Sequence, residues 1–315
     1  MTTLAEIEAA RSRIAGTAIR TPLVRLHAGE QGTEIYLKLE NLQPINSFKI
    51  RGAFNAVMLA TAAERARGLV TASAGNMAQG VAWAARAIGV PATIAVPEHA
   101  PEAKIAAIER LGGRVIKLPY NDWWDVIVAA RLDGVDGLFV HPVQDPAVIA
   151  GNGTIGLEIL EDLPDPDAVV IPYGGGGLTA GIASAVRALR PQCRIVTVEP
   201  APGAAFAAAV AAGEPVDIDF HASFVDGAGS RRVLDSMWPV VRPLVDSALT
   251  VPVADVADAV RMIAERARVI AEGAGALAAA AALTGRAGRG KVVCVVSGGN
   301  INLSRLAEIL GEAAG

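Results

Sequence analysis

Three glycine-rich turns in this sequence have the composition of ligand-binding loops. Each follows an apolar run rich in β-branched residues and precedes a stretch with helical spacing; the three turns are Ser73–Asn76, Gly174–Gly177 and Ser297–Asn300. In parallel α/β sheets, ligands bind beyond the carboxyl ends of the strands. We therefore expect these turns to contribute to one binding site.

The four consecutive glycines Gly174–Gly177 are the most informative of these turns. Residues without a Cβ atom let several backbone N–H groups converge on an anion, and a helix beginning near Leu178 adds its positive end. This composition predicts a phosphate site. The same stretch also fits a dinucleotide fingerprint, with Gly175 and Gly177 at its glycine positions and Glu199 near the place of a ribose-binding acid. The turn by itself leaves both alternatives open.

Alternating apolar runs and helical stretches predict the elements that position these turns. The predicted strands are 34–40, 68–73, 92–97, 114–118, 137–141, 168–172, 194–199, 248–253 and 291–297, with helices at 76–88, 100–111 and 121–132 and a first helix opened by the capping box Thr3-Leu4-Ala5-Glu6. Such alternation is typical of parallel sheets covered by helices on both faces. We predict an α/β fold with two parallel sheets, a seam at His141–Gly153, where Pro, Asp and Gly cluster, and a binding cleft between the sheets.

Composition excludes several classes of protein. The 315 residues are 52% hydrophobic, which is enough to bury a core, and the formal net charge of −4 argues against a nucleic-acid partner. The two cysteines are too few for a disulfide framework, so we expect Cys193 and Cys294 to be buried free thiols. The most apolar tract, Ala274–Leu283, is too short to span a membrane, and the N-terminus lacks the pattern of a signal peptide. We expect a cytoplasmic protein with neither a membrane nor a nucleic acid as partner.

The segment around Lys49, Asn41-Leu-Gln-Pro-Ile-Asn-Ser-Phe-Lys-Ile-Arg-Gly52, places a lysine where a helix is expected to begin. It resembles the cofactor-lysine segment of the fold-type II pyridoxal-phosphate enzymes, in the branch of the threonine/serine dehydratases (threonine ammonia-lyases) and serine racemases. The resemblance continues in the family's order along nearly the whole chain, at Thr71–Gly80, Asp145–Glu158, Gly174–Gly177, Val198–Pro200, Glu272–Gly275 and Ser297–Asn300. Because all the motifs occur in this order, the resemblance outweighs the dinucleotide alternative.

The resemblance implies the tryptophan synthase β-like architecture, with two parallel-sheet domains and the cofactor, pyridoxal 5′-phosphate, in the cleft between them. Together with the two series of strands, it predicts a large cofactor-binding domain of residues 1–42 and 143–315 and a small domain of residues 43–142. The implied activity is a dehydratase (ammonia-lyase) that eliminates water from a β-hydroxy amino acid, with L-threonine or L-serine as the expected substrate, giving a 2-oxo acid and ammonia. A homodimer or larger homo-oligomer is also implied.

The resemblance further assigns roles to individual residues. Lys49 would hold the cofactor as a Schiff base and, once freed, would act as the base at Cα. The cofactor would be bound by Lys49, Phe48, Asn76, Gly174, Gly175, Gly176, Gly177, Leu178, Glu272 and Ser297, with the glycines on its phosphate and Ser297 facing its ring nitrogen. The substrate carboxylate would be received by Ser73, Ala74, Gly75, Asn76 and Met77. Glu272 could equally be an acid that stabilises the start of a helix.

Three positions depart from the family's usual pattern. Racemases of this branch carry a serine where this chain has Ala74, which favours elimination over racemisation. The family usually has histidine in place of Met77, and Thr-Gly-Ser in place of Ile45-Asn46-Ser47. These two departures leave the identity of the substrate open.

Alternatives to threonine and serine follow from this. The first is another 3-hydroxy amino acid, either bulkier or similar to 3-hydroxyaspartate; a β-replacement reaction comes next, and an NAD-dependent dehydrogenase last. The sequence leaves open whether a cation is bound. Members of the family hold one near an Ala-Asp-Gly turn that has a glutamate upstream. This chain keeps Asp226-Gly227 of that turn, but Ala222 replaces the upstream glutamate. The four histidines lack the spacing of metal ligands.

Overall fold

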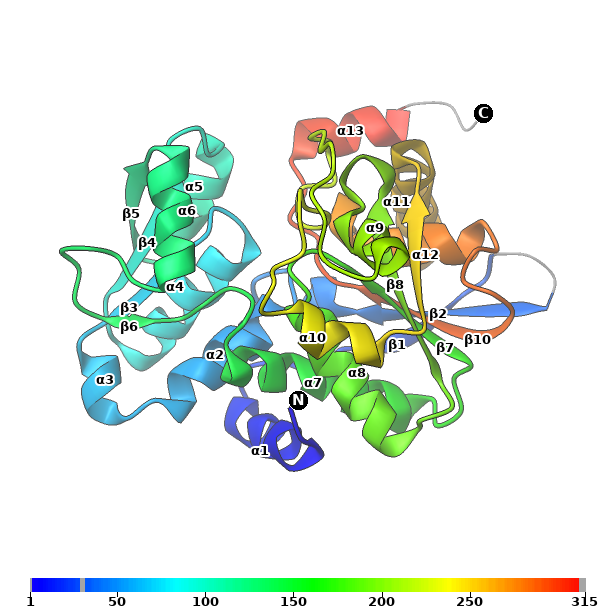
Figure 1. Ribbon diagram of the computed structural model, residues 1–315, viewed down its shortest axis with the longest axis horizontal. Helices are drawn as coiled ribbons and strands as arrows, with labels where there is room; N and C mark the ends of the chain where they lie inside the picture. Colours follow the sequence, from blue (N-terminus) through cyan, green and yellow to red (C-terminus); the bar gives the residue numbers. More distant parts are fainter. Residues whose placement is uncertain (1, 29–31, 312–315) are drawn as a thin grey trace.

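Two β-sheets, each flanked by helices, make up the computed structural model, which describes residues 2–28 and 32–311 (Figure 1). The six-stranded sheet has the order β1 (Leu23–Leu26), β2 (Thr33–Leu39), β10 (Gly290–Val296), β7 (Ala168–Pro172), β8 (Arg194–Pro200) and β9 (Ser247–Val251). The four-stranded sheet has the order β5 (Gly113–Leu118), β4 (Ala92–Pro97), β3 (Leu69–Ala72) and β6 (Leu138–Phe139). Neighbouring strands are parallel except for the antiparallel pair β1 and β2. The predicted α/β class with two parallel sheets is confirmed.

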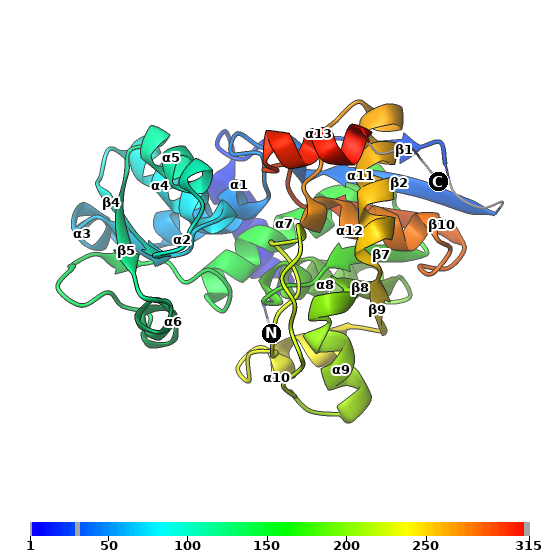
Figure 2. The same ribbon diagram turned by 90° about the horizontal axis from the view of Figure 1, so that it is seen from above.

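Helices connect the parallel strands and cover the sheets. They are α1 (Leu4–Ile14), α2 (Lys49–Leu59), α3 (Ala62–Ala66), α4 (Asn76–Ile88), α5 (Glu102–Arg110), α6 (Tyr120–Ala129), α7 (Pro146–Asp162), α8 (Gly177–Leu189), α9 (Ala205–Ala212), α10 (Trp238–Val241), α11 (Val253–Ala267), α12 (Gly273–Leu283) and α13 (Leu303–Gly311), with 3₁₀ turns η1 (Glu40–Leu42), η2 (Ala201–Gly203) and η3 (Arg242–Leu244). In both views the four-stranded sheet and its helices lie beside the six-stranded sheet (Figures 1 and 2). Within the described ranges, no helix has the length and apolar character needed to cross a membrane.

The central strands of the six-stranded sheet are buried on both faces. Along β10, Val292, Cys294 and Val296 pack into a core cluster with α11 and α12, whereas Val293 and Val295 pack into a second cluster with α8 and α9. Successive side chains of a strand point to opposite faces. Where a strand has a helical layer on each side, its buried positions are apolar on both faces, which is why Val292–Val296 of β10 appear in the sequence as a continuous apolar run.

The helices and strands lie within a few residues of their expected bounds, with one strand missed. The capping box is present at α1, where the Thr3 side chain and Glu6 exchange hydrogen bonds. Strand β1 was not predicted, because it has four residues, of which only Leu26 is buried, and so has too little pattern to mark it. Its antiparallel pairing with β2 is the one departure from parallel pairing in the described sheets.

The second half of the predicted seam at His141–Gly153 lies within a helix, because α7 begins at Pro146. Asp145 accepts a hydrogen bond from Ala147 N at 2.8 Å, and proline is favoured in the first turn, so this Asp-Pro pair starts a helix. The glycines that follow serve close packing: a Cβ atom at Gly151 would lie 2.5 Å from the carbonyl oxygen of Arg51. The cluster of Pro, Asp and Gly therefore marks a helix start and a tight helix contact.

The two sheets draw on separate parts of the chain. Strands of the four-stranded sheet lie within residues 69–139, and those of the six-stranded sheet within 23–39 and 168–296. The domain boundaries placed after residues 42 and 142 stay a prediction, and Met1 and residues 29–31 and 312–315 of the predicted large domain lie outside the described residues. Cys193 and Cys294 are buried free thiols, as expected.

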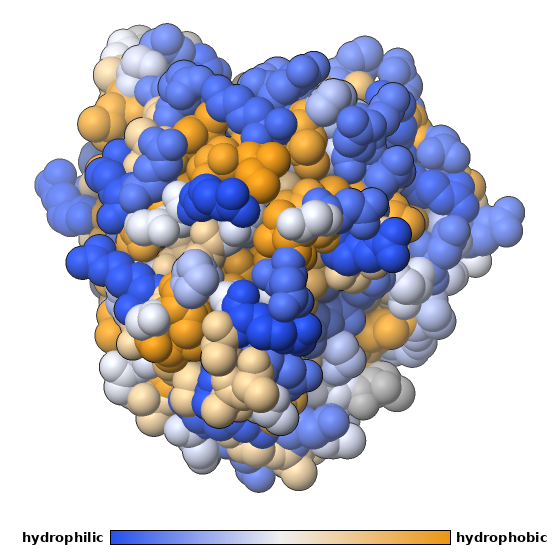
Figure 3. All heavy atoms as spheres, turned by 90° about the vertical axis from the view of Figure 1, so that its left-hand side faces the viewer, coloured by the Kyte–Doolittle hydropathy of each residue, from blue (hydrophilic) through white to orange (hydrophobic). Residues whose placement is uncertain are grey.

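The outer face on the side of the four-stranded sheet carries both hydrophilic and hydrophobic patches (Figure 3). Helix α6 exposes Tyr120, Trp124 and Val128, which recur every four residues. Residues four apart share one face of a helix. Helix α6 thus presents an apolar stripe to solvent, while Val126 and Ile127 pack toward the four-stranded sheet.

Candidate active site

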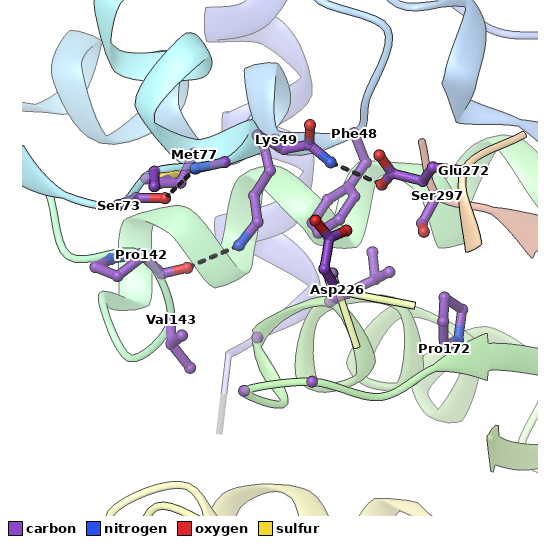
Figure 4. Close-up of a pocket in the computed structure, with 18 of the residues that line it drawn as sticks. Phe48, Lys49, Ser73, Met77, Pro142, Val143, Pro172, Asp226, Glu272 and Ser297 are labelled. Carbon is purple, nitrogen blue, oxygen red and sulfur yellow. Dashed lines mark hydrogen bonds between the residues drawn. The ribbon is translucent and has the colours of Figure 1, made fainter. Parts of the chain in front are cut away.

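One cavity of about 340 Å³ opens where the carboxyl ends of strands from both sheets meet (Figure 4). Ser73 follows β3, Pro97 ends β4, Pro172 ends β7 and Ser297 follows β10, and all four residues line the cavity. Its volume is typical of small-molecule sites. Every site residue predicted from the sequence lines this cavity, namely Phe48, Lys49, Ser73, Ala74, Gly75, Asn76, Met77, Gly174, Gly175, Gly176, Gly177, Leu178, Glu272 and Ser297. The structure brings these residues together, while their individual roles stay predictions.

Lys49 is the first residue of α2, and its side chain reaches into the cavity (Figure 4). Its Nζ atom donates a hydrogen bond to the carbonyl oxygen of Pro142 at 2.9 Å, and the centroid of the Phe48 ring lies 5.2 Å from Nζ. Burial lowers the pKa of Lys49 from 10.5 to about 8, because the interior disfavours the ammonium form. A sizeable fraction of the amine is therefore neutral near physiological pH, as a nucleophile or a base must be.

The backbone before Lys49 is held against the turn that follows β10. Phe48 N donates to the carbonyl oxygen of Ser297 at 3.0 Å, and Gly299 N donates to that of Asn46 at 2.9 Å. Asn46 has a φ of 56°, in the left-handed region that favours glycine and tolerates asparagine better than most residues. The departure from the usual Thr-Gly-Ser therefore keeps the backbone conformation that glycine would supply.

The tetraglycine turn connects β7 to α8 and packs so closely against Val143 that only glycine lets its backbone form a cradle here. Gly176 has a φ of 94°. A Cβ atom at Gly175 would lie 2.5 Å from Val143 Cγ2, and one at Gly177 would lie 2.7 Å from the Val143 carbonyl oxygen. The first N–H groups of α8 have no partner within the helix, and the helix dipole is positive at this end. The turn therefore fits a phosphate group.

Glu272 immediately precedes α12, yet its side chain makes no capping hydrogen bond to the helix. Its carboxylate accepts hydrogen bonds from Asn76 Nδ2 at 2.8 Å and from Asn300 N at 3.1 Å, and Asn300 Nδ2 donates to Asn76 Oδ1 at 2.8 Å. A Cβ atom at Gly275 would lie 2.2 Å from the carbonyl oxygen of Gly298, so glycine is required for the two turns to approach. The motifs around Glu272 and Asn300 are therefore in direct contact at the wall of the cavity.

The surroundings of Glu272 also change its acidity. Burial raises the pKa of Glu272 to about 7, the charge of Asp226 raises it further, and the hydrogen bond from Asn76 opposes the rise. The carboxyl group therefore exchanges its proton near neutral pH. Of the two alternatives for Glu272, its position favours an acid in the cavity over one that stabilises a helix.

The loop predicted to receive the substrate carboxylate leads into the N-terminus of α4. Ser73 Oγ accepts a hydrogen bond from Gly75 N at 3.2 Å, and Asn76 is the first residue of the helix. Helix N-termini attract carboxylates through free N–H groups and the helix dipole. Met77 is buried in the core of the four-stranded sheet and adds an apolar group to the cavity wall.

Several residues that line the cavity were not predicted from the sequence; they are Pro97, Lys104, Trp123, Pro142, Val143 and Pro172. Lys104 on α5 forms an ion pair with Asp226 in the segment between α9 and α10. Trp123 Nε1 donates to the carbonyl oxygen of Ala95 at 3.1 Å, which fixes the indole in the wall. No motif marks Lys104 or Trp123, because each occurs in a helix whose sequence is ordinary and reaches the cavity only through the fold.

The cation left open by the sequence gains no ligand set from the structure. Asp226, at the centre of the candidate turn, pairs with Lys104. Among residues 2–28 and 32–311, no group of three or more His, Cys, Asp and Glu side chains is placed to hold a metal ion.

His141 lies in the turn beside Lys49. Its Nδ1 atom accepts hydrogen bonds from Val143 N and Gln144 N, both at 3.1 Å, and burial lowers the pKa of His141 to about 4. It is a neutral group that shapes the turn beside Lys49.

Glu199 is not available to bind a ribose, as the dinucleotide alternative would require. Its side chain is buried, and its carboxylate accepts hydrogen bonds from Phe206 N at 3.0 Å and from Ala207 N at 2.9 Å. These contacts hold the first turn of α9, which is a structural role.

Comparisons with known proteins agree with this geometry. The chain matches the family described as pyridoxal-phosphate dependent enzyme over residues 14–298. It is 41% identical to the L-threonine ammonia-lyase of Thermotoga maritima, over 99% of this chain and 79% of the relative. It is 38% identical to the catabolic L-threonine dehydratase of Escherichia coli K12, over 97% of this chain and 95% of the relative. The structure of maize serine racemase is similar, with a TM-score of 0.90 and 32% identity over 98% of this chain and 96% of that one.

Proposed function

The chain belongs to the family of pyridoxal-phosphate dependent enzymes, and we propose that it is a dehydratase (ammonia-lyase) acting on L-threonine or L-serine. The reaction removes the α-proton and the β-hydroxyl group as water, and hydrolysis of the remaining enamine gives a 2-oxo acid and ammonia. The observation that carries the proposal is the convergence of Lys49, the glycines 174–177 and the loop 73–77 on one cavity. Relatives named L-threonine ammonia-lyase and L-threonine dehydratase support it.

Pyridoxal phosphate, when bound, supplies an electron sink for the α-carbon of the substrate. The glycine cradle and the N-terminus of α8 would hold its phosphate group, and Ser297 would face its ring nitrogen. Phe48 and Asn76 would contact its ring. All these groups line the cavity that Lys49 enters, which supports their assignment to the cofactor.

The side chains around Cα favour elimination. Lys49 can accept the α-proton, since its pKa of about 8 leaves part of the amine neutral at physiological pH. Ala74 lines the cavity with a methyl group, which cannot donate the proton that racemisation needs on the opposite face of Cα. Glu272, with a pKa of about 7, can hold or release a proton beside Asn76.

The charges in the cavity favour a substrate with a neutral side chain. The described residues that line it include two cationic side chains, Lys49 and Lys104, and Lys104 is paired with Asp226. Lys49 is needed by the cofactor. A second carboxylate, as in 3-hydroxyaspartate, would lie near Asp226 and Glu272 without a free cation, and an unpaired buried charge is costly. This supports threonine or serine over 3-hydroxyaspartate.

We also propose the domain division and the assembly stated from the sequence. The four-stranded sheet supports a small domain of residues 43–142, because all its strands fall in that range, and those of the six-stranded sheet fall within 1–42 and 143–315. A homodimer or larger homo-oligomer follows from the resemblance, and light scattering of the purified protein tests it. A cytoplasmic location is supported by the two buried free thiols, which suit a reducing compartment, and cell fractionation tests it.

The proposed activity is tested with protein reconstituted with pyridoxal phosphate. We expect 2-oxobutanoate from L-threonine and pyruvate from L-serine, measured as 2-oxo acid released, in a screen that includes both enantiomers, allothreonine, 3-hydroxyaspartate and 3-phenylserine. Borohydride should fix the cofactor on Lys49, and mass spectrometry locates it. Lys49→Ala should reduce turnover at least about 100-fold, since it removes the proposed base.

Lys117→Ala is the matched control, because Lys117 is exposed, pairs with Glu102 and does not line the cavity. It should keep both turnover and the borohydride label. Absence of a 2-oxo acid from every amino acid in the screen would exclude the proposed reaction. A label on another lysine would exclude the proposed role of Lys49.

A further inference from the structure

Four buried charged side chains are in contact at α2, the helix that begins with Lys49; one of them, Arg51, belongs to this helix. We call them the charge cluster: Lys38, Glu40, Arg51 and Glu158, with exposed fractions of 0, 0, 1 and 5%. Two are positive and two are negative, so the charges balance. Arg51 and Glu158 occur in segments that the sequence analysis singled out, yet none of these four residues lines the cavity.

Arg51 is the centre of the charge cluster. Its Nε and Nη2 atoms each donate to a different oxygen of Glu40 at 2.8 Å, and its Nη1 and Nη2 atoms donate to the two oxygens of Glu158 at 2.6 and 2.8 Å. Nη1 also donates to Thr154 Oγ1, and Nη2 to the carbonyl oxygen of Ile19, both at 3.1 Å. Two bidentate pairs fix the plane of the guanidinium group, which a single point charge could not do.

The other members tie Arg51 to separate parts of the chain. Lys38 Nζ, on β2, donates to Glu158 Oε2 and to the carbonyl oxygen of Thr21, both at 2.6 Å, and Thr21 Oγ1 donates to Glu40 Oε1 at 2.5 Å. Burial opposes ionisation of Glu40, but Arg51 outweighs it and holds the pKa of Glu40 below its ordinary range. Arg51 thus keeps Glu40 in its ionised form, and the charge cluster connects α2 with β2, α7 and the segment before β1.

Close packing at the same turn leaves α2 little freedom. A Cβ atom at Gly151 on α7 would lie 2.5 Å from the carbonyl oxygen of Arg51, and one at Gly52 would lie 2.7 Å from that of Val148. Buried ion pairs are often no more stabilising than apolar packing of equal volume, and their best supported use is to fix one arrangement of the chain. Fixing the orientation of α2 is thus a more fitting role for the charge cluster than stability alone.

The orientation of α2 decides where Lys49 points. Lys49 and Arg51 are two residues apart, which places their side chains about 200° apart around the helix axis. A rotation of α2 by about 10° would move an atom about 6 Å from the axis by on the order of 1 Å. A misplacement of this size can reduce a rate about 100-fold.

We propose that Arg51 is a positioning residue, whose paired contacts with Glu40 and Glu158 fix the rotation of α2 and so aim the Lys49 amine into the cavity. The inference rests on the proposed role of Lys49 as the cofactor lysine. It requires a planar guanidinium group two residues after that lysine, and not merely a positive charge.

Arg51→Lys tests this, because it keeps the charge and removes the planar fork. Arg187→Lys is the matched control: Arg187 forms an ion pair with Asp246 and donates to the carbonyl oxygens of Leu244 and Cys193, and it does not line the cavity. Two quantities are measured on each apoprotein: the Tm, and the rate of pyridoxal phosphate capture at a temperature well below the Tm. We expect both variants to lower the Tm, and only Arg51→Lys to slow capture, by at least about tenfold.

A second variant keeps the test possible if Arg51→Lys does not fold. Arg51→Gln combined with Glu40→Gln keeps the charges balanced and retains the Lys38–Glu158 pair, and it should slow capture in the same way. Capture by Arg51→Lys as fast as by Arg187→Lys would overturn the positioning role. The positioning role would also be overturned if both Arg51 variants failed to fold while Arg187→Lys folded, because the charge cluster would then serve stability alone.

The wild-type protein separates this inference from the proposed function. If borohydride does not fix the cofactor on wild-type Lys49, the role of Lys49 fails, and the inference with it. If the wild-type protein is labelled at Lys49 and the capture rates of Arg51→Lys and the control are equal, only the positioning role fails.

Discussion

The lowered pKa of Lys49 predicts that the apoprotein captures pyridoxal phosphate much faster at neutral pH than an ordinary lysine does. Burial moves this pKa from 10.5 to about 8, a shift equivalent to about 3 kcal/mol. At about pH 7, the neutral fraction of the amine rises from about 0.03% to about 10%, which is roughly 300-fold. Only the neutral amine attacks an aldehyde, so the capture rate should follow this fraction.

The assay mixes apoprotein with excess pyridoxal phosphate and follows the absorbance of the bound cofactor between about pH 6 and about pH 10. The same reaction with N-acetyl-lysine corrects for ionisation of the cofactor. We expect the corrected rate to rise about tenfold per pH unit below about pH 8 and to level off above it, while the model amine continues to rise. Lys49→Ala should abolish the signal.

Stability gives an independent check on the same group. Between about pH 8 and 10.5, the unfolded chain carries a proton on Lys49 that the folded apoprotein does not carry, so this residue makes folding stability rise with pH across that window. Lys49→Met should remove this contribution in urea titrations. A capture midpoint near 10.5, with no change in the pH dependence of stability, would refute the argument that burial sets the reactivity of Lys49.

Four further predictions concern other residues. Gly177→Ala places a Cβ atom 2.7 Å from a backbone carbonyl oxygen, so equilibrium dialysis should show pyridoxal phosphate binding weakened at least about tenfold; unchanged binding would contradict the cradle. Glu272→Gln removes a carboxyl group with a pKa of about 7, so the pH profile of kcat/KM should lose its limb near that value; a limb that persists belongs to another group. Asp226→Asn frees Lys104 from its ion pair, and kcat/KM for 3-hydroxyaspartate relative to L-threonine should rise about tenfold; an unchanged ratio would remove the charge argument for the substrate. Asn46→Val puts a β-branched residue at a φ of 56° and should lower the free energy of unfolding in urea by about 1–2 kcal/mol, whereas Asn46→Gly should be tolerated; equal stability of the two variants would show that the turn is not strained.

Much of the fold was predictable because its signals are local. The apolar run that becomes β10 is continuous since both of its faces are covered, and the capping box at Thr3 is complete within four residues. The candidate site was predictable for the same reason. Its turns lie directly after predicted strands, and parallel strands bring such turns to one edge of a sheet.

Contacts between distant segments were not predictable in this way. Lys104 and Asp226 are separated by 122 residues, and Arg51 and Glu158 by 107. Neither ion pair leaves a local pattern, because a lysine or a glutamate on a helix has the same appearance in a sequence whether it faces solvent or a partner. The role of Gly151 on α7 was not predictable for a related reason: the sequence shows a cluster of Pro, Asp and Gly, but not that Gly151 lies against Arg51 of α2.

The sequence by itself thus determined the class of fold, the family and the residues that meet around Lys49, since strand periodicity and motif order are properties of neighbouring residues. Only the tertiary structure decided how that lysine is held. The burial that lowers the pKa of Lys49, the pairing of Lys104 with Asp226 and the charge cluster around Arg51 all depend on which distant side chains come within a few ångströms. Desolvation and charge pairing act over such short distances, so they arise only when the chain has folded.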